Sequence, residues 1–116
     1  LRTLSRVISQ YTDDTIHAGR YGGEEFLILF LGYTRKQAGK ILEGMLTNFR
    51  NQEYDFLPED VIITFSAGFT YLDNKNMDVE SFIKCADEAL YYSKEHGRNQ
   101  ITYYNDLKLR DMQVNR

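Results

Sequence analysis

Two glycines followed by two carboxylates are the residues of this chain whose types and spacing best suit chemistry on a phosphate. They lie in the run Arg20-Tyr21-Gly22-Gly23-Glu24-Glu25-Phe26. A Gly-Gly pair between two strand-like segments predicts a hairpin turn at Gly22-Gly23, because both turn positions require φ > 0. Such a backbone can approach a phosphate closely, and a hard cation can join that phosphate to a carboxylate oxygen.

The two carboxylates, Glu24 and Glu25, are expected to have different roles. Successive residues of a strand point to opposite faces, so the two side chains leave the backbone in opposite directions and cannot form one clamp. At most one of them is expected to hold a given ion.

Two cations, Lys94 and Arg98, form the second group of interest. They stand four residues apart at the end of a predicted helix that Asp78 caps and Gly97 terminates. This spacing brings side chains together on a helix. The helix dipole alone explains cations in most last turns, so a phosphate-binding role needs support from elsewhere in the chain.

The elements that position these residues follow from the apolar pattern. Spacings of three and four predict helices, and alternation or short apolar runs predict strands. Helices are predicted over residues 1–11, 35–49 and 79–96, and strands over residues 15–21, 26–31, 61–72 and 101–104. Thr34 and Gln37 form a capping box at the start of the second helix. This order predicts an α/β (α+β) fold with helices on a mainly antiparallel sheet.

Two of the predicted strands carry further signals. The strand at residues 26–31 is apolar on both faces, so it is expected to be covered on both sides or to lie centrally in its sheet. In the strand at residues 61–72, Ser66-Ala67-Gly68 resembles a nucleophile elbow. Thr64 stands where that motif needs glycine, and no histidine is placed to serve Ser66, so a structural role is favoured.

Composition excludes several classes of protein. The chain has 116 residues, a net charge of −3 and dispersed acidic residues, which argues against a nucleic-acid-binding face. The single cysteine, Cys85, excludes an internal disulfide and a cysteine zinc site, and is expected to fill the core. No apolar run is long enough to cross a bilayer, and a soluble domain is expected. The start at Leu1, in helical phase, suggests a piece of a longer protein.

Two motifs together closely resemble the signature segments of GGDEF domains, the diguanylate cyclases. They are residues 20–26 and residues 86–99, the latter reading Ala-Asp-Glu-Ala-Leu-Tyr-Tyr-Ser-Lys-Glu-His-Gly-Arg-Asn. Residues 64–68 resemble the strand that lies between them in that family. The resemblance covers nearly all of residues 1–104 and leaves residues 105–116 as a charged tail or linker.

The resemblance implies a ferredoxin-like, palm-type fold and a bacterial signalling enzyme. Members of the family condense two GTP molecules into cyclic di-GMP within a face-to-face homodimer, using Mg²⁺ or Mn²⁺. The 3′-hydroxyl of one nucleotide attacks the α-phosphate of the other. An attached sensor or receiver domain, a cytoplasmic location and no membrane contact by this domain are implied as well.

Residue by residue, the resemblance assigns roles to both groups. Gly22 and Gly23 would let the backbone approach the nucleotide. Glu24 would bind the metal and help to activate the 3′-hydroxyl, and Glu25 would support that site. Lys94 and Arg98 would hold the terminal phosphates, in keeping with the need of phosphoryl transfer for positioning and charge neutralisation.

The chain departs from the family pattern in two places. The opening strand and helix, with an aspartate that is the second metal ligand and the guanine-binding Asn and Asp residues, are absent. That strand is central in the family, so this fragment is expected to be inactive alone, and to misfold, to borrow a strand or to continue in a longer polypeptide. The product-binding RxxD motif is replaced by Asp13 and Ile16, which predicts no feedback inhibition through that site.

Three hypotheses remain open on the sequence. The first is a diguanylate cyclase catalytic domain. The second is a GGDEF-type module without catalysis that binds GTP or a partner and regulates an attached domain. The third is an α/β domain in which the glycine turn and the helix-end cations are purely structural, which the coincidence of two motifs disfavours.

Overall fold

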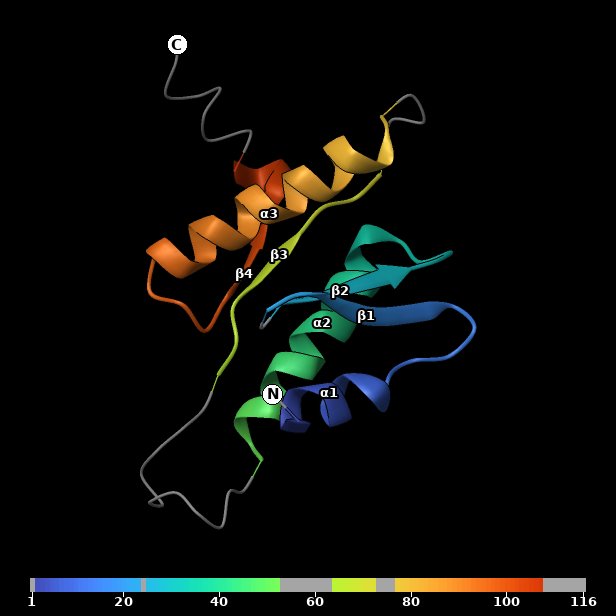
Figure 1. Ribbon diagram of the computed structural model, residues 1–116, viewed down its shortest axis with the longest axis vertical. Helices are drawn as coiled ribbons and strands as arrows, with labels where there is room; N and C mark the ends of the chain where they lie inside the picture. Colours follow the sequence, from blue (N-terminus) through green and yellow to red (C-terminus); the bar gives the residue numbers. More distant parts are fainter. Residues whose placement is uncertain (1, 24, 53–63, 73–76, 108–116) are drawn as a thin grey trace. The chain divides into compact units, whose positions relative to one another are not determined.

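The computed structural model describes residues 2–23, 25–52, 64–72 and 77–107. Within these residues, helices and strands follow in the predicted order: α1 (Arg2–Ser9), β1 (Ile16–Gly22), β2 (Glu25–Phe30), α2 (Arg35–Arg50), β3 (Ala67–Phe69), α3 (Val79–Glu95) and β4 (Ile101–Tyr103). Small sheets flanked by helices place the chain in the predicted α/β (α+β) class (Figure 1). The chain divides into two compact units, residues 1–63 and residues 64–116.

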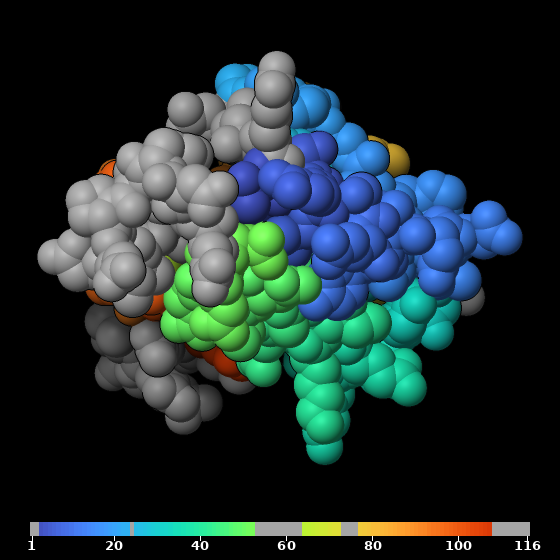
Figure 2. Space-filling view, turned by 90° about the horizontal axis from the view of Figure 1, so that it is seen from below, coloured from blue at the N-terminus to red at the C-terminus, as the bar shows by residue number. Residues whose placement is uncertain are grey.

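The core of the first unit forms where α1 packs on α2. Figure 2 shows the blue residues of the N-terminal helix against the green end of α2. Asn48 of α2 donates from Nδ2 to Tyr11 Oη at 3.5 Å, just beyond the end of α1. The buried apolar side chains of this unit are Val7, Ile8, Ile16, Ala38, Leu42, Met45, Leu46 and Phe49. The helix predicted over residues 35–49 therefore enters the core through Ala38, Leu42, Met45, Leu46 and Phe49.

The start of α2 confirms the predicted capping box. Thr34 Oγ1 accepts from the Gln37 backbone N–H at 3.1 Å, and Gln37 Oε1 accepts from the Thr34 N–H at 3.0 Å. Two backbone donors of the first turn are thus satisfied by side chains, which fixes where the helix begins.

The hairpin of β1 and β2 has a turn one residue later than predicted. The strands are antiparallel, with Arg20 opposite Phe26 and Gly22 opposite Glu25. The register shifts between Arg20 and Gly22, a bulge at Tyr21 that adds one residue to β1. Gly22 therefore ends the strand. Of the two glycines, only Gly23 has a positive φ, at +42°. The prediction that both glycines occupy the turn is wrong for this reason.

One face of β2 is open. Leu27 and Leu29 are 40% and 46% exposed, whereas the alternate residues Phe26, Ile28 and Phe30 are half-buried. Among the described residues, β2 pairs with β1 alone. Within the described residues, β2 therefore lacks the second neighbour that the sequence predicted for a strand with two apolar faces.

In the second unit, α3 covers a parallel pair of strands, β3 and β4. Ala67 lies opposite Ile101, and Phe69 lies opposite Tyr103. Figure 1 shows α3 lying alongside both strands. A Cβ on Gly68 would lie 2.2 Å from Ala86 O and from Leu90 N, so the strand touches the helix backbone directly. Only glycine permits this approach.

The strand predicted over residues 61–72 is much shorter in the structure. Within residues 64–72, hydrogen-bonded strand is confined to Ala67–Phe69, and Ser66 lies just before it. Residues 61–63 of the prediction lie outside the described residues. After β4, residues 104–107 are helical, where a tail without regular structure was predicted from residue 105. The domain boundary at residue 104 stays a prediction.

Candidate functional site

Arg20 holds the glycine turn from the strand that precedes it. Its guanidinium donates from Nη2 to the Gly23 carbonyl oxygen and lies over the Phe26 ring, 5.8 Å from the ring centroid. A Cβ on Gly22 or Gly23 would meet no heavy atom of the described residues within 4 Å. The Arg20 side chain therefore holds the backbone of the turn, and the described residues leave space beside both glycines. Sequence reasoning gave Arg20 no role, because a side-chain contact with the Gly23 carbonyl leaves no pattern in a single sequence.

The structure describes only one of the two predicted acids, Glu25. Glu25 is half-buried at the start of β2, opposite Gly22. Glu24 lies outside the described residues. Among the described residues, no group of three histidine, cysteine, aspartate or glutamate side chains could hold a metal ion.

The carboxyl groups of these two acids have the chemistry that suits a hard cation such as Mg²⁺ or Mn²⁺. Carboxylate oxygens are the ligands that such hard cations prefer. Mg²⁺ in nucleotide enzymes is typically bound through one or two carboxylates together with substrate phosphates, so a complete cage of protein ligands is not required. The donor chemistry of these acids therefore suits such a metal.

The end of α3 is a Schellman-type cap, in agreement with the prediction that Gly97 terminates this helix. Gly97 has φ +108°, and the Arg98 N–H donates to Ser93 O at 2.9 Å. At the other end of α3, Asp78 accepts from the Ser81 N–H at 2.7 Å. Both predicted ends of this helix are therefore confirmed.

Lys94 and Arg98 lie at the same end of α3 but in different backbone settings. Lys94 is half-buried in the last helical turn. Arg98 is exposed beyond the helix, with φ +59°. The four-residue argument for their proximity is therefore wrong in its premise, because α3 ends at Glu95 and the helical spacing does not extend to Arg98. The prediction that these cations and the glycine turn hold one nucleotide stays a prediction, since the two groups belong to different units.

Sequence reasoning missed two polar residues that support the end of α3. Ser93 is fully buried, and its hydroxyl donates to Ala67 O at 2.8 Å and lies 2.7 Å from Thr102 Oγ1. It links α3 to both strands beneath it. Gln100 donates to carbonyls at the helix end. The signal for Ser93 was a polar residue on the apolar stripe of α3, which requires buried partners.

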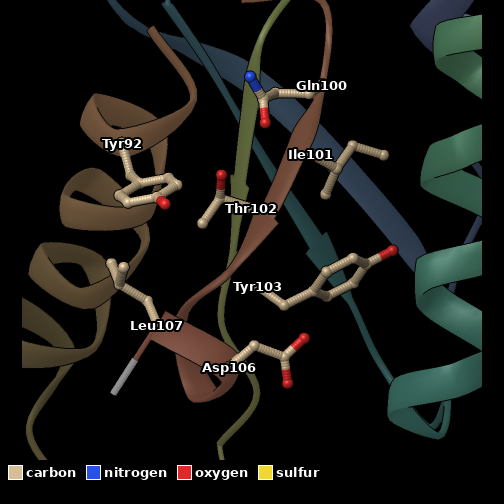
Figure 3. A pocket seen from close by; sticks show the side chains of 7 residues that line it. All are labelled: Tyr92, Gln100, Ile101, Thr102, Tyr103, Asp106 and Leu107. Atoms are coloured by element: carbon tan, nitrogen blue, oxygen red, sulfur yellow. The ribbon is translucent and has the colours of Figure 1, made fainter. Parts of the chain in front are cut away.

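A small pocket lies between α3, β4 and the helical residues after β4. Its volume is about 130 Å³, and Tyr92 and Thr102 are among its lining residues (Figure 3). Ligand pockets for drug-sized molecules span about 300–1,000 Å³, so this pocket does not accommodate a nucleotide. None of the predicted site residues that the structure describes lines it.

The two residues at the RxxD positions have structural roles. Asp13 Oδ1 accepts from the Thr15 hydroxyl at 2.6 Å, the Thr15 N–H at 2.7 Å and the Ile16 N–H at 3.0 Å. The hydrogen bonds from Thr15 and Ile16 hold the pKa of Asp13 below its usual value. Ile16 is 4% exposed and belongs to the core. Both positions therefore stabilise the start of β1.

In the described part of the chain, none of the helices is long and apolar enough to cross a membrane.

Comparison with known proteins identifies the family. The family described as "Diguanylate cyclase, GGDEF domain" matches residues 1–100. Diguanylate cyclase A of Treponema denticola is 30% identical over 105 residues, which cover 88% of this chain and 28% of that protein. Diguanylate cyclase DosC of Shigella sonnei is 31% identical over 103 residues, which cover 84% of this chain and 22% of that protein. The chain thus spans less than a third of these curated relatives.

Solved structures give the same result. The GGDEF domain of DgcB from Caulobacter crescentus, determined in complex with c-di-GMP, superposes with a TM-score of 0.80 at 29% identity, covering 90% of this chain and 62% of that one. The active GGEEF domain of a diguanylate cyclase from Vibrio cholerae superposes with a TM-score of 0.76 at 29% identity, covering 90% of this chain and 65% of that one. With both signature segments inside the matched residues, this chain belongs to the GGDEF domain family of diguanylate cyclases.

Proposed function

We propose that this chain is the catalytic domain of a diguanylate cyclase that condenses two GTP molecules into cyclic di-GMP. The observation that carries the proposal is the glycine turn, with Gly23 in the left-handed region, the Arg20 guanidinium on the Gly23 carbonyl and open space at both glycines. The family match supports the same chemistry, because it spans this turn and the end of α3.

The proposed reaction consists of two nucleotidyl transfers. The 3′-oxygen of one GTP forms a bond to the α-phosphorus of the other, and the bond from that phosphorus to the pyrophosphate oxygen breaks. The 3′-hydroxyl proton leaves to a base, for which Glu24 is the proposed residue. A second, identical step closes the ring and releases the second pyrophosphate.

The chain's own residues would position and neutralise the triphosphate. The backbone at Gly22 and Gly23 would lie against the phosphates, where a side chain would hinder approach. Glu24 would bind the metal and Glu25 would support the site. A bound Mg²⁺ or Mn²⁺ would supply charge neutralisation at the phosphates. Lys94 and Arg98 would hold the terminal phosphates, which carry the negative charge that leaves with pyrophosphate.

The active assembly is proposed to be a homodimer with one GTP bound to each domain. Each nucleotide provides both an attacking hydroxyl and an attacked phosphorus, so two bound nucleotides must face each other. An attached sensor or receiver domain would control the association of the two GTP-bound domains. The use of GTP as substrate places the proposed reaction in the cytoplasm.

Incubation of the complete protein with GTP and Mg²⁺ tests the proposal. Cyclic di-GMP and pyrophosphate are expected, with a rate that rises more steeply than linearly with protein concentration while dimers are scarce. Glu24→Gln nearly preserves the shape of the side chain and should abolish the formation of cyclic di-GMP. The control Glu43→Gln, at an exposed position of α2, should leave this formation unchanged. No cyclic di-GMP at high concentrations of folded protein would contradict the enzyme and favour the regulatory module without catalysis.

A further inference from the structure

Three consecutive residues after α3 have positive φ angles. Gly97 has φ +108°, Arg98 has φ +59° and Asn99 has φ +49°. Glycine adopts positive φ angles freely. Other residues adopt them uncommonly, although asparagine does so more often than most. A bulky residue such as arginine remains there only when its surroundings determine the conformation. Contacts with the surrounding structure therefore hold the backbone of Arg98 in a conformation that arginine rarely adopts.

The side chain of Gln100 makes the contacts that hold this segment. Its Nε2 group donates to His96 O at 2.6 Å and lies 3.3 Å from both Ser93 O and Arg98 O. These three carbonyls belong to the last turn of α3, its C-cap and the left-handed segment itself. One carboxamide thus joins the helix end to Arg98.

Gln100 is itself fixed by the sheet. Its backbone carbonyl accepts from the Ala67 N–H at 2.9 Å, and Ile101 begins β4 immediately after it. Figure 3 shows Gln100 at the end of β4 that continues from the loop leaving α3. The Arg98 N–H in turn donates to Ser93 O at 2.9 Å, and Ser93 is hydrogen-bonded to β3 through Ala67 O. The conformation of Arg98 is therefore determined by contacts to both α3 and the sheet.

We propose that Gln100 is a positioning residue, which keeps Arg98 in the left-handed conformation that presents its guanidinium to the terminal phosphates of GTP. The inference deepens the proposed function and rests on it. Gln100 has no direct contact with the nucleotide in this account. Its effect reaches the ligand only through Arg98, since its amide hydrogens are directed to backbone carbonyls.

An ordinary helix cap is the competing explanation, and it makes a different prediction. A cap stabilises the fold and changes nucleotide binding only as far as the folded population changes. Asp78 provides the matched control, because it caps the other end of the same helix through the Ser81 N–H. Asp78→Ala should weaken α3 to a similar degree as the loss of the Gln100 contacts.

The experiment measures nucleotide binding to the complete protein by calorimetry, with Mg²⁺. The probes are a GTP analogue with a non-hydrolysable α,β bridge and GMP. Gln100→Met keeps the length of the side chain and removes its donors. It should raise the Kd of the triphosphate roughly five- to thirty-fold, the effect of losing one or two hydrogen bonds. The Kd of GMP, which lacks the terminal phosphates, should change less than about twofold.

Two comparisons complete the test. Asp78→Ala should leave both Kd values unchanged in the folded protein. In an Arg98→Ala background, Gln100→Met should add no further loss, because the residue through which it acts is gone. If Gln100→Met does not fold, Gln100→Ala serves for the same measurements.

The outcomes separate this inference from the function on which it rests. If Arg98→Ala weakens triphosphate binding but Gln100→Met does not, or acts equally on GMP, the positioning role of Gln100 is overturned and the phosphate role of Arg98 stands. If Gln100→Met adds its full loss in the Arg98→Ala background, the inference is likewise overturned. If Arg98→Ala itself leaves triphosphate binding unchanged, the phosphate role of Arg98 in the proposed function fails, and the inference fails with it.

Discussion

The guanidinium of Arg20 lies over the ring of Phe26, with 5.8 Å between its central carbon and the ring centroid. The two residues face each other across the hairpin, and the same guanidinium donates to the carbonyl oxygen of Gly23. The aromatic ring at the start of β2 thus orients an arginine that fixes the turn.

Replacing Arg20 should therefore affect catalysis more than folding. Arg20→Gln removes an exposed cation–π contact, which contributes about 0.5–1 kcal/mol, so the melting temperature should fall only slightly. The rate of cyclic di-GMP formation should fall about tenfold to a hundredfold, because small displacements of positioning groups are costly. Lys36→Gln, on the exposed face of α2, is the control. Full activity of Arg20→Gln would remove the turn-positioning role of Arg20.

Gly68 should tolerate no side chain. A Cβ there would lie 2.2 Å from backbone atoms of Ala86 and Leu90, and helix backbone cannot move aside as a flexible side chain can. Gly68→Ala should lower the free energy of unfolding by about 3 kcal/mol or more.

Gly19→Ala is the matched control for that substitution. Gly19 lies in β1, and its added Cβ would meet no atom of the described residues within 4 Å. The free energy of unfolding should change by less than about 0.5 kcal/mol. Denaturant unfolding of both variants measures the difference, and similar stabilities would contradict the close contact of β3 with α3.

Asp13 should make the stability of the fold depend on pH. Hydrogen bonds from Thr15 and Ile16 lower the pKa of its carboxyl in the folded chain from 3.8. A group whose folded pKa is lowered stabilises the fold at pH values above its unfolded pKa, and this contribution is lost as the pH falls through the folded pKa. Asp13→Asn should therefore be less stable than the natural sequence at pH 7.

The difference between Asp13→Asn and the natural sequence should shrink as the pH falls below about 4, near the unfolded pKa of aspartate. Urea unfolding at several pH values measures it. A stability difference independent of pH for Asp13→Asn would mean that its ionised carboxylate does not stabilise the turn.

Cyclic di-GMP should not act as a noncompetitive inhibitor through the positions of Asp13 and Ile16. The first presents a carboxylate engaged with the backbone, and the second is buried, so neither can bind a phosphate as arginine does. Initial rates at several GTP and cyclic di-GMP concentrations test this. Any slowing should be overcome by GTP, whereas a fall in the maximal rate would contradict the absence of this inhibitory site.

The parts of the fold that could be predicted are those with a local chemical signal. Thr34 and Gln37 define the start of α2, and Asp78 and Gly97 define both ends of α3, because each satisfies backbone groups within a few residues. The alternating pattern over residues 61–72 predicted too long a strand, because alternation does not reveal where a partner strand ends.

Features that depend on pairing or on close packing were not predictable. The bulge at Tyr21 moved the turn by one residue, since the register is set by β2 and not by the glycines alone. The exposed Leu27 and Leu29 reflect which strands lie beside β2. The roles of Arg20 and Gln100 arise from side-chain contacts with backbone carbonyls, for which a single sequence gives no pattern.

The central claim is that one triphosphate contacts both the glycine turn and the cations at the end of α3. A crystal structure of the complete protein with Mg²⁺ and a non-hydrolysable GTP analogue tests it directly. The account predicts phosphates against the backbone of Gly22 and Gly23, with Lys94 and Arg98 within hydrogen-bonding distance of the terminal phosphates. A nucleotide bound at the turn with both cations directed elsewhere would contradict it.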